Sequence, residues 1–175
     1  MGTLDGASGA PTGLLRIVLG TSDSIAGTVY GTIVVMSAIA LGAEATRDGW
    51  RLSSIVAASV IVLWFAHVYS HGLGEAIGRG HQLDRAEFVS VVRRELAIPM
   101  AAVAPICVLL LGAIGLFEER TAVWIALGIG FATLVAVGFR YAALERLDMR
   151  GTMIGVGTNV GIGLVIIALE VAVAH

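Results

Sequence analysis

Five long apolar stretches, separated by short charged segments, dominate this sequence of 175 residues. They cover residues 24–43, 53–72, 98–117, 121–141 and 152–173. Each is close to the roughly 20 helical residues that cross the hydrocarbon core of a bilayer. Backbone N–H and C=O groups find no water inside that core, so they must be satisfied within helices. The sequence therefore predicts an all-α, polytopic integral membrane protein with five transmembrane helices.

The composition excludes several other classes of protein. Hydrophobic residues make up 57% of the chain and charged residues only 14%, too few to cover the surface of a soluble domain. The net charge of -2 gives no reason to expect a nucleic-acid partner. Cys107 is the single cysteine, so no disulfide can form within one chain. No phosphate-binding loop, nucleophile elbow or H-E-x-x-H motif occurs, and we expect no enzymatic activity.

The arginines set the expected orientation. The chain has 11 basic residues, and all of them are arginine. Eight lie in the N-terminal tail and in the second and fourth loops, namely Arg16, Arg79, Arg85, Arg93, Arg94, Arg140, Arg146 and Arg150. The first and third loops carry the other three, Arg47, Arg51 and Arg120. Because cytoplasmic loops are enriched in basic residues, this alternation predicts a cytoplasmic N-terminus and an outer C-terminus.

This orientation defines the expected organisation of the chain. Residues 1–22 are expected to form a cytoplasmic tail and interfacial lead-in, and residues 23–175 a single five-helix membrane domain. Within that domain, residues 74–97 are predicted to contain a cytoplasmic amphipathic loop helix. Apolar residues recur there at near-helical spacing among arginines, which favours a helix on the inner leaflet near anionic head groups. A plain charged linker helix is the alternative. We expect the domain to lie in a bacterial-type plasma membrane.

Glycine pairs spaced four residues apart indicate close helix packing. Three such pairs occur, at Gly27 and Gly31, at Gly151 and Gly155, and at Gly157 and Gly161. Their concentration on the fifth stretch predicts a helix pressed against a neighbour, either within the chain or across a dimer.

The residues with the most chemical potential lie at the end of the second stretch. His67, His71 and Glu75 fall four residues apart and share one face of a helix. Ionisable groups at a membrane boundary are costly and are commonly functional, and imidazole and carboxylate suit divalent metals such as Zn, Fe and Mn. Asp23 and Asn159 are the further candidate ligands, because they lie at similar depths. The alternatives are a helix cap for Asp23, an interhelical hydrogen bond for Asn159, and histidines that reach toward head groups.

The segment Ser70-His71-Gly72-Leu73-Gly74-Glu75 resembles the Ser-Met-Gly-Leu-Gly-Asp type of segment in span 2 of the vacuolar iron transporter (VIT/CCC1-like) family. Asp23-Ser24 stands where that family has an Asp-Gly at the start of span 1. The resemblance implies a short, divergent member with five spans and a cytoplasmic N-terminus. It also implies a homodimer whose ion path is lined by Asp23, His67, His71 and Glu75, with proton exchange by analogy. The glutamate-rich cytoplasmic domain of larger members is absent from this sequence.

These observations lead to a functional hypothesis. We expect a transporter that moves divalent metal ions, Fe or Mn first and Zn next, out of the cytoplasm. The cation is the substrate, no tightly bound cofactor is expected, and the partners are membrane lipid and a second copy of the chain. One alternative is a non-transporting accessory or scaffold subunit whose glycine-rich helices pack against a larger partner. A membrane redox subunit with His67 and His71 as haem ligands is a third alternative. Histidines on adjacent turns of one helix cannot easily ligate both faces of one haem, and no other span has a histidine in its interior to supply the second axial ligand.

Overall fold

The computed structural model describes residues 22–146 and 148–173, with side chains for residues 25–146, 148–168 and 172. Six helices follow one another: α2 (Ser22–Ala45), α3 (Gly49–Arg79), α4 (Arg85–Arg94), α5 (Ala97–Ala113), α6 (Glu119–Leu144) and α7 (Met149–Val173). The described residues contain no strand, so the predicted all-helical fold is confirmed for them. The expected tail and interfacial lead-in, except Ser22, lie outside the described residues.

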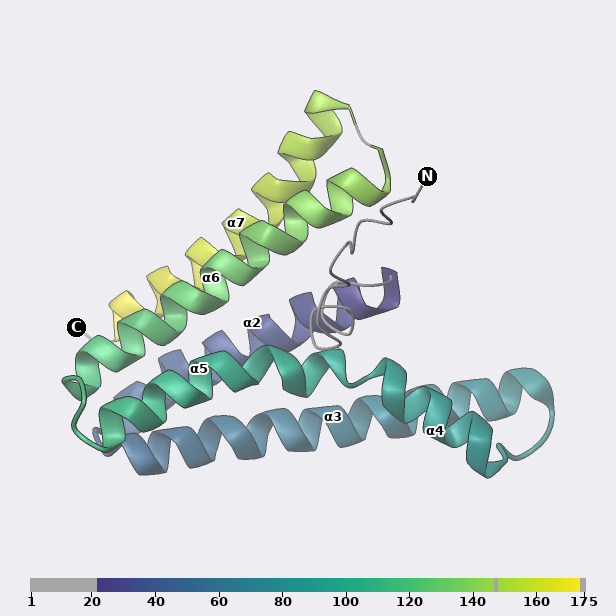
Figure 1. The fold of residues 1–175 in the computed structure, drawn as a ribbon, viewed down its shortest axis with the longest axis horizontal. Helices are drawn as coiled ribbons and strands as arrows, with labels where there is room; N and C mark the ends of the chain where they lie inside the picture. The colour runs from purple at the N-terminus through teal and green to yellow at the C-terminus, as the bar shows by residue number, and fades with distance from the viewer. Residues whose placement is uncertain (1–21, 147, 174–175) are drawn as a thin grey trace, which may run out of the picture.

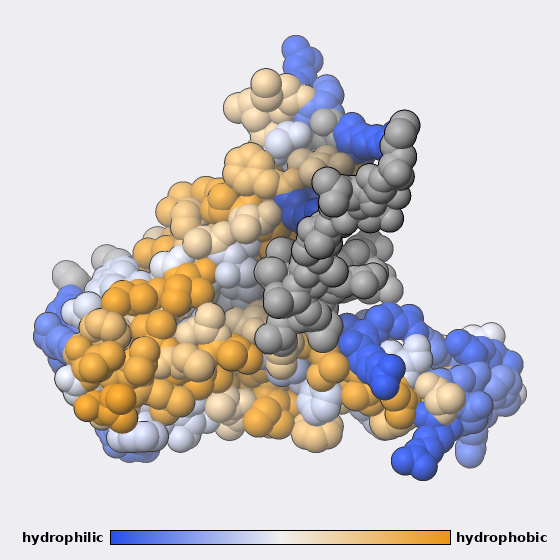
Figure 2. Space-filling model, in the orientation of Figure 1, coloured by the Kyte–Doolittle hydropathy of each residue, from blue (hydrophilic) through white to orange (hydrophobic). Residues whose placement is uncertain are grey.

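Four helices are long and apolar enough to cross a membrane, namely α2, α3, α6 and α7. The third predicted stretch gives a shorter helix, α5, which reaches this length only when it is joined to α4 across a bend of 43°. The cause lies at its end, where Gly115 has φ +82° and so takes a left-handed conformation that terminates helices. The described part of the chain thus has four or five candidate spans. Figure 2 shows the matching surface, with hydrophobic residues over the bundle and hydrophilic residues toward its extremities.

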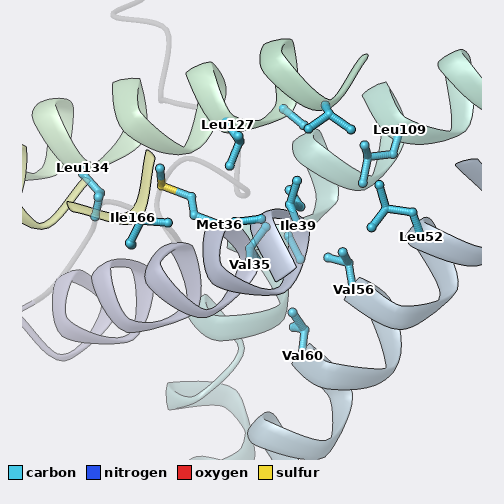
Figure 3. Close-up of a cluster of buried hydrophobic side chains, with 14 of the residues drawn as sticks. Val35, Met36, Ile39, Leu52, Val56, Val60, Leu109, Leu127, Leu134 and Ile166 are labelled. Carbon is cyan, nitrogen blue, oxygen red and sulfur yellow. The ribbon is translucent and has the colours of Figure 1, made fainter. Parts of the chain in front are cut away.

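The core lies around α2, which contacts α3, α5, α6 and α7. Val35, Met36 and Ile39 of α2 have no exposed surface, and they meet apolar side chains from all four neighbouring helices (Figure 3). The residues drawn from those helices include Val56, Val60, Leu109, Leu127, Leu134 and Ile166. Because α2 and α5 lie between α3 and the α6–α7 pair, the molecule has one continuous core (Figure 1).

The predicted glycine pair on α2 brings two helices to backbone contact. A Cβ atom added at Gly31 would lie 2.7 Å from the carbonyl oxygen of Ile98, and one at Gly27 would lie 3.1 Å from Ala97. The first of these distances is too short for any side chain larger than hydrogen, so this pair lets α2 and α5 cross closely. On α7 the outcome is mixed, since Gly155 faces Tyr141 of α6, whereas Gly157 has no described atom within 4 Å of its added Cβ.

Helix α3 is too long to be contained in a bilayer. Its 31 residues extend over about 46 Å at 1.5 Å per residue, against about 30 Å of hydrocarbon. Beyond the bundle it ends at Gly80, whose φ of 71° stops the helix, and the chain turns back into α4. Asp84 and Glu87 form a reciprocal capping box at the start of α4. We call residues 68–95 the hairpin, and the end of the bundle that carries it the hairpin end.

The helices also diverge toward one side. In Figure 1, α6 and α7 run close together and separate from α3 and α5 as α6 approaches its C-terminus. The loops that join α2 to α3 and α5 to α6 lie together at the other end, which we call the opposite end.

Candidate functional site

We call the predicted row of His67, His71 and Glu75 the stripe. It lies on the side of α3 that faces other helices at the hairpin end. The ring of His67, which is half-buried, lies 4.6 Å from the ring of Tyr30 on α2, measured between centroids, at an angle of 40°. The His71 ring follows at 5.7 Å from that of His67, in an edge-on arrangement. The two histidines are therefore neighbours, as their spacing of four residues predicts.

The stripe meets a buried carboxylate. Nδ1 of His71 lies 2.5 Å from Oε1 of Glu95, the residue that ends α4 and precedes α5. Glu95 is only 7% exposed. Removing a carboxylate from water is costly unless a partner compensates for it, and His71 supplies a charge-assisted hydrogen bond when it carries the proton. The pair joins α3 to the α4–α5 junction.

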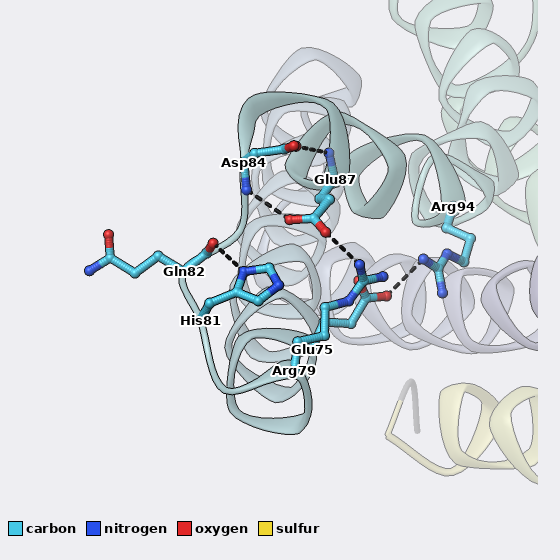
Figure 4. Close-up of polar contacts among 7 residues, drawn as sticks. All are labelled: Glu75, Arg79, His81, Gln82, Asp84, Glu87 and Arg94. Atoms are coloured by element: carbon cyan, nitrogen blue, oxygen red, sulfur yellow. Dashed lines mark hydrogen bonds and ion pairs between the residues drawn. The ribbon is translucent and has the colours of Figure 1, made fainter.

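Glu75 takes part in an ion-pair network between α3 and α4 (Figure 4). Its Oε1 accepts a hydrogen bond from Nη2 of Arg94 at 2.7 Å, and its Oε2 lies 3.5 Å from Arg79. Arg79 donates a further bond, of 2.5 Å, to Glu87. The arginine side chains are about half exposed, so each pair contributes little to stability. The network sets the register between the two helices of the hairpin.

A cavity of about 280 Å³ lies beside these groups. Its lining includes Ser70, His71, Gly74, Glu75, Val91, Arg94 and Glu95. A water molecule takes up about 30 Å³ in the liquid, so the cavity has room for a small cation that retains several waters. The imidazole of His71 and the carboxylates of Glu75 and Glu95 line the cavity, and both types of group are common ligands of such cations.

The other two predicted ligands, Asn159 and Asp23, belong to α7 and α2. Asn159 is on α7, where its amide nitrogen lies 3.1 Å from a Cβ atom added at Gly138 of α6. It therefore packs between α6 and α7 and is not brought to the stripe. Asp23 is in the first turn of α2, and its side chain lies outside the described residues. Among the residues that the structure does describe, no group of three or more His, Cys, Asp or Glu side chains is arranged to hold a metal ion.

Glu95 is the site residue that the pattern of the stripe misses. A signal for it exists in the sequence, because Glu95 follows Val91 by four residues and precedes Ile98 by three. All three are buried. A single acid in an otherwise apolar helical row indicates a group with a specific partner.

The opposite end carries a second cavity, of about 370 Å³. Its charged lining residues are Glu44, Arg47, Glu118, Glu119 and Arg120, and all of them are exposed. Glu119 accepts a hydrogen bond of 3.2 Å from the backbone N–H of Gly49, at the start of α3.

Comparison with known proteins identifies no relative. No protein-family model, no curated protein and no solved structure matches this chain. The likeness to the vacuolar iron transporter family therefore stays a prediction.

Proposed function

We propose that the chain is a transporter that moves divalent metal ions, Fe²⁺ or Mn²⁺ first and Zn²⁺ next, out of the cytoplasm. In this proposal it crosses the membrane five times, with a cytoplasmic N-terminus and an outer C-terminus. The hairpin end is then cytoplasmic, as are the segments to which the sequence assigns eight of the 11 arginines. The cavity beside His71 and Glu95 is the entry site for the ion.

The observation that carries the proposal is the pairing of His71 with Glu95. Their nitrogen and oxygen atoms are 2.5 Å apart, so two donors of the kinds that bind these ions already converge. Metal–ligand bonds of about 2.0–2.2 Å need only a small separation of the two atoms. Metal binding requires a neutral imidazole and an ionised carboxylate, so the proton shared by the pair leaves as the ion enters.

Two more groups complete the proposed site. His67 lies one turn away on the same face, and Glu75 becomes available when it exchanges Arg94 for the cation. A substrate site must release its ion, so a set of protein ligands supplemented by water suits transport better than a closed cage. Reprotonation of His71 and Glu95 would assist that release.

The test is ion flux in proteoliposomes. Purified protein is reconstituted, and Mn²⁺ and Fe²⁺ flux is followed for the wild type and for the variants His71→Ala and Glu95→Gln. We expect both variants to lose most of the flux. His81→Ala is the matched control, because His81 is an exposed histidine of the same hairpin that bonds only the adjacent Gln82 carbonyl. Normal flux in both site variants would refute the proposal.

A scaffold subunit is the second candidate function. The observation that favours it is on α7, where Gly157 and Gly161 have no atom of residues 22–146 or 148–173 within 4 Å of an added Cβ. A glycine pair open on a membrane helix fits a further helix, from a larger protein or from a second copy in the expected homodimer. If the folded wild type binds none of Fe²⁺, Mn²⁺ or Zn²⁺ in calorimetry, the scaffold function replaces transport.

A further inference from the structure

The hairpin has two unlike flanks, and its contacts define them. His71, Glu75 and Arg79 of α3 each bond a residue of the returning segment, so they mark the side of α3 that faces α4. In a helix, the residue next to a contact position points about 100° away from it. Val68 and Gly72 are buried, so they are contact positions of α3 as well. Tyr69 and Leu73 each follow one of them by one position and therefore lie on one flank of α3, where they are 72% and 49% exposed.

Helix α4 is arranged in the same way. Val91 is buried and Glu87 bonds Arg79, so these two residues mark the side of α4 that faces α3. Phe88 and Val92 each follow one of them by one position, and Ser90 precedes Val91. Phe88 and Val92 are thus on one flank of α4, and Ser90 is on the other.

The flanks of the two helices match, because α3 and α4 are antiparallel. In two antiparallel helices that face each other, the contact sides point in opposite directions and the chains also wind in opposite directions when viewed from one end. The residue one position after a contact residue therefore points to the same side of the pair in both helices. The apolar flank of the hairpin is Tyr69, Leu73, Phe88 and Val92. The polar flank is Ser70, Gly74, Ala86 and Ser90. The cavity supports this assignment, since Ser70 and Gly74 line it and none of the apolar-flank residues does.

The charges of the hairpin are distributed unequally. Glu75, Glu87 and Glu95 are each bonded to an arginine or histidine within the hairpin, and Asp84 caps α4. Among the described residues, the exposed Arg85 and Arg93 on the outer side of α4 form no ion pair. The acidic groups are therefore used internally, and the charge that the hairpin presents outward is positive.

The apolar flank continues a surface of α3 that faces lipid. Val62 and Phe65 lie within the membrane-spanning part of α3, and they are 68% and 61% exposed. Tyr69 and Leu73 extend the same side beyond the bundle. The polar flank turns the other way, toward α2, because His67 contacts Tyr30 on that side. A helix longer than the bilayer tilts, which brings its projecting end toward the head groups.

We propose that the hairpin rests its apolar flank on the membrane and that Arg85 and Arg93 bind the phosphates of anionic phospholipids. Tyr69, Leu73, Phe88 and Val92 enter the boundary between head groups and acyl chains, as the apolar face of an interfacial helix does. The two arginines are attracted to the negative surface of the leaflet. This contact keeps the polar flank and its cavity directed toward the bundle. The inference is independent of the transport proposal.

The first experiment measures the depth of each flank. Cys107 is the only cysteine, so a Cys107→Ala background permits single labelling with bimane at Phe88→Cys or, as the matched control, at Ser90→Cys. The full-length protein is reconstituted in vesicles of phosphatidylcholine and phosphatidylglycerol that contain nitroxide-labelled lipid. We expect lipid nitroxides to quench the label at position 88 and aqueous iodide to quench the label at position 90. Quenching of both positions by iodide alone would overturn the proposal.

The second experiment tests the lipid class. Quenching at position 88 is compared between nitroxide-labelled phosphatidylglycerol and phosphatidylcholine, in the parent and in Arg85→Gln and Arg93→Gln variants. We expect a preference for the anionic lipid that falls about fivefold for each arginine removed. An equal response to both lipids in the parent would contradict the role of the arginines. Disulfide cross-linking of the unlabelled Phe88→Cys protein between copies, with no lipid quenching of the label, would assign the flank to a second copy instead.

Discussion

The two ends of the helical bundle both place acidic and basic side chains around a cavity, but they use them in different ways. At the hairpin end, Glu95 is nearly buried and shares a short hydrogen bond with His71. At the opposite end, Glu44 and Glu118 are exposed, and Glu119 bonds the first backbone N–H of α3. Charge and cavity volume alone would not separate these two places. The burial of Glu95 and its bond to a histidine side chain distinguish the hairpin end from the opposite end.

The opposite end shows what carboxylates do when they serve only the fold. Asp48 caps α3 by accepting hydrogen bonds from the backbone N–H groups of Trp50, at 2.9 Å, and Arg51. Such acids remain in water and satisfy helix termini. Glu95 is removed from water, which no helix terminus requires, and its partner is the imidazole of His71. This difference is the reason to place ion binding at the hairpin end.

The largest expected effect is on metal binding by Glu95→Gln. The amide keeps the size of the side chain but loses the anionic oxygen, so we expect Mn²⁺ affinity in calorimetry to fall by about 10- to 100-fold. Glu119→Gln is the matched control at the opposite end and is expected to bind Mn²⁺ as the wild type does. Equal losses in both variants would erase the distinction between the ends.

Asp48→Ala is expected to have the reverse profile. Loss of the cap on α3 costs about 1 kcal/mol of stability, which lowers the midpoint of thermal unfolding in detergent. Mn²⁺ affinity is expected to stay unchanged, because the cap lies at the far end of α3 from His71. A reduced affinity at unchanged stability would mean that the opposite end belongs to the ion site.

Arg94→Gln should strengthen cation binding. Arg94 holds Glu75 at 2.7 Å, so its removal frees a carboxylate and takes one positive charge from the cavity. An exposed ion pair is worth about 0.2–1 kcal/mol, and we expect Mn²⁺ affinity to rise by less than tenfold. Weaker binding in this variant would show that Arg94 supports the site and does not compete with the ion.

Arg79→Gln is expected to give the smallest change. It removes the contacts with Glu75 and Glu87, but its side chain is 47% exposed, and such pairs contribute about 0.2–1 kcal/mol. Stability and Mn²⁺ affinity should both remain close to those of the wild type. A loss comparable to that of Glu95→Gln would mean that the whole network, and not the His71–Glu95 pair, forms the site.

Much of the fold could be predicted from hydrophobicity, because a long apolar run in a membrane has few alternatives to a helix. The end of α3 was harder to place. Gly72, Gly74 and Gly78 are typical of a loop, yet the helix continues to Arg79 because α4 packs along it and supplies partners for its charged residues. The glycine pairs were also ambiguous: a Cβ added at Gly31 would meet the backbone of Ile98, whereas one added at Gly157 would meet no atom in the part of the chain that the structure describes.

Of the candidate site, the histidines on α3 could be predicted from the sequence, but their pairing with Glu95 could not. Local helical spacing brings His67 and His71 together, and a single sequence is enough to see it. The partner of His71 lies 24 residues away, and its position depends on the turn at Gly80 and on the bend between α4 and α5. Those are tertiary features, so the sequence identifies the imidazoles and leaves the buried carboxylate unassigned.

Pulsed electron paramagnetic resonance of Mn²⁺ bound to the purified protein tests directly whether His67 and His71 ligate the ion. Coordination by imidazole produces nitrogen modulation of the electron spin echo, and ¹⁵N labelling of histidine identifies its source. We expect this modulation in the wild type and in His81→Ala, and its loss in the His67→Ala/His71→Ala double variant. Bound Mn²⁺ without nitrogen modulation in the wild type, or unchanged modulation in the double variant, would contradict an ion site at the hairpin end.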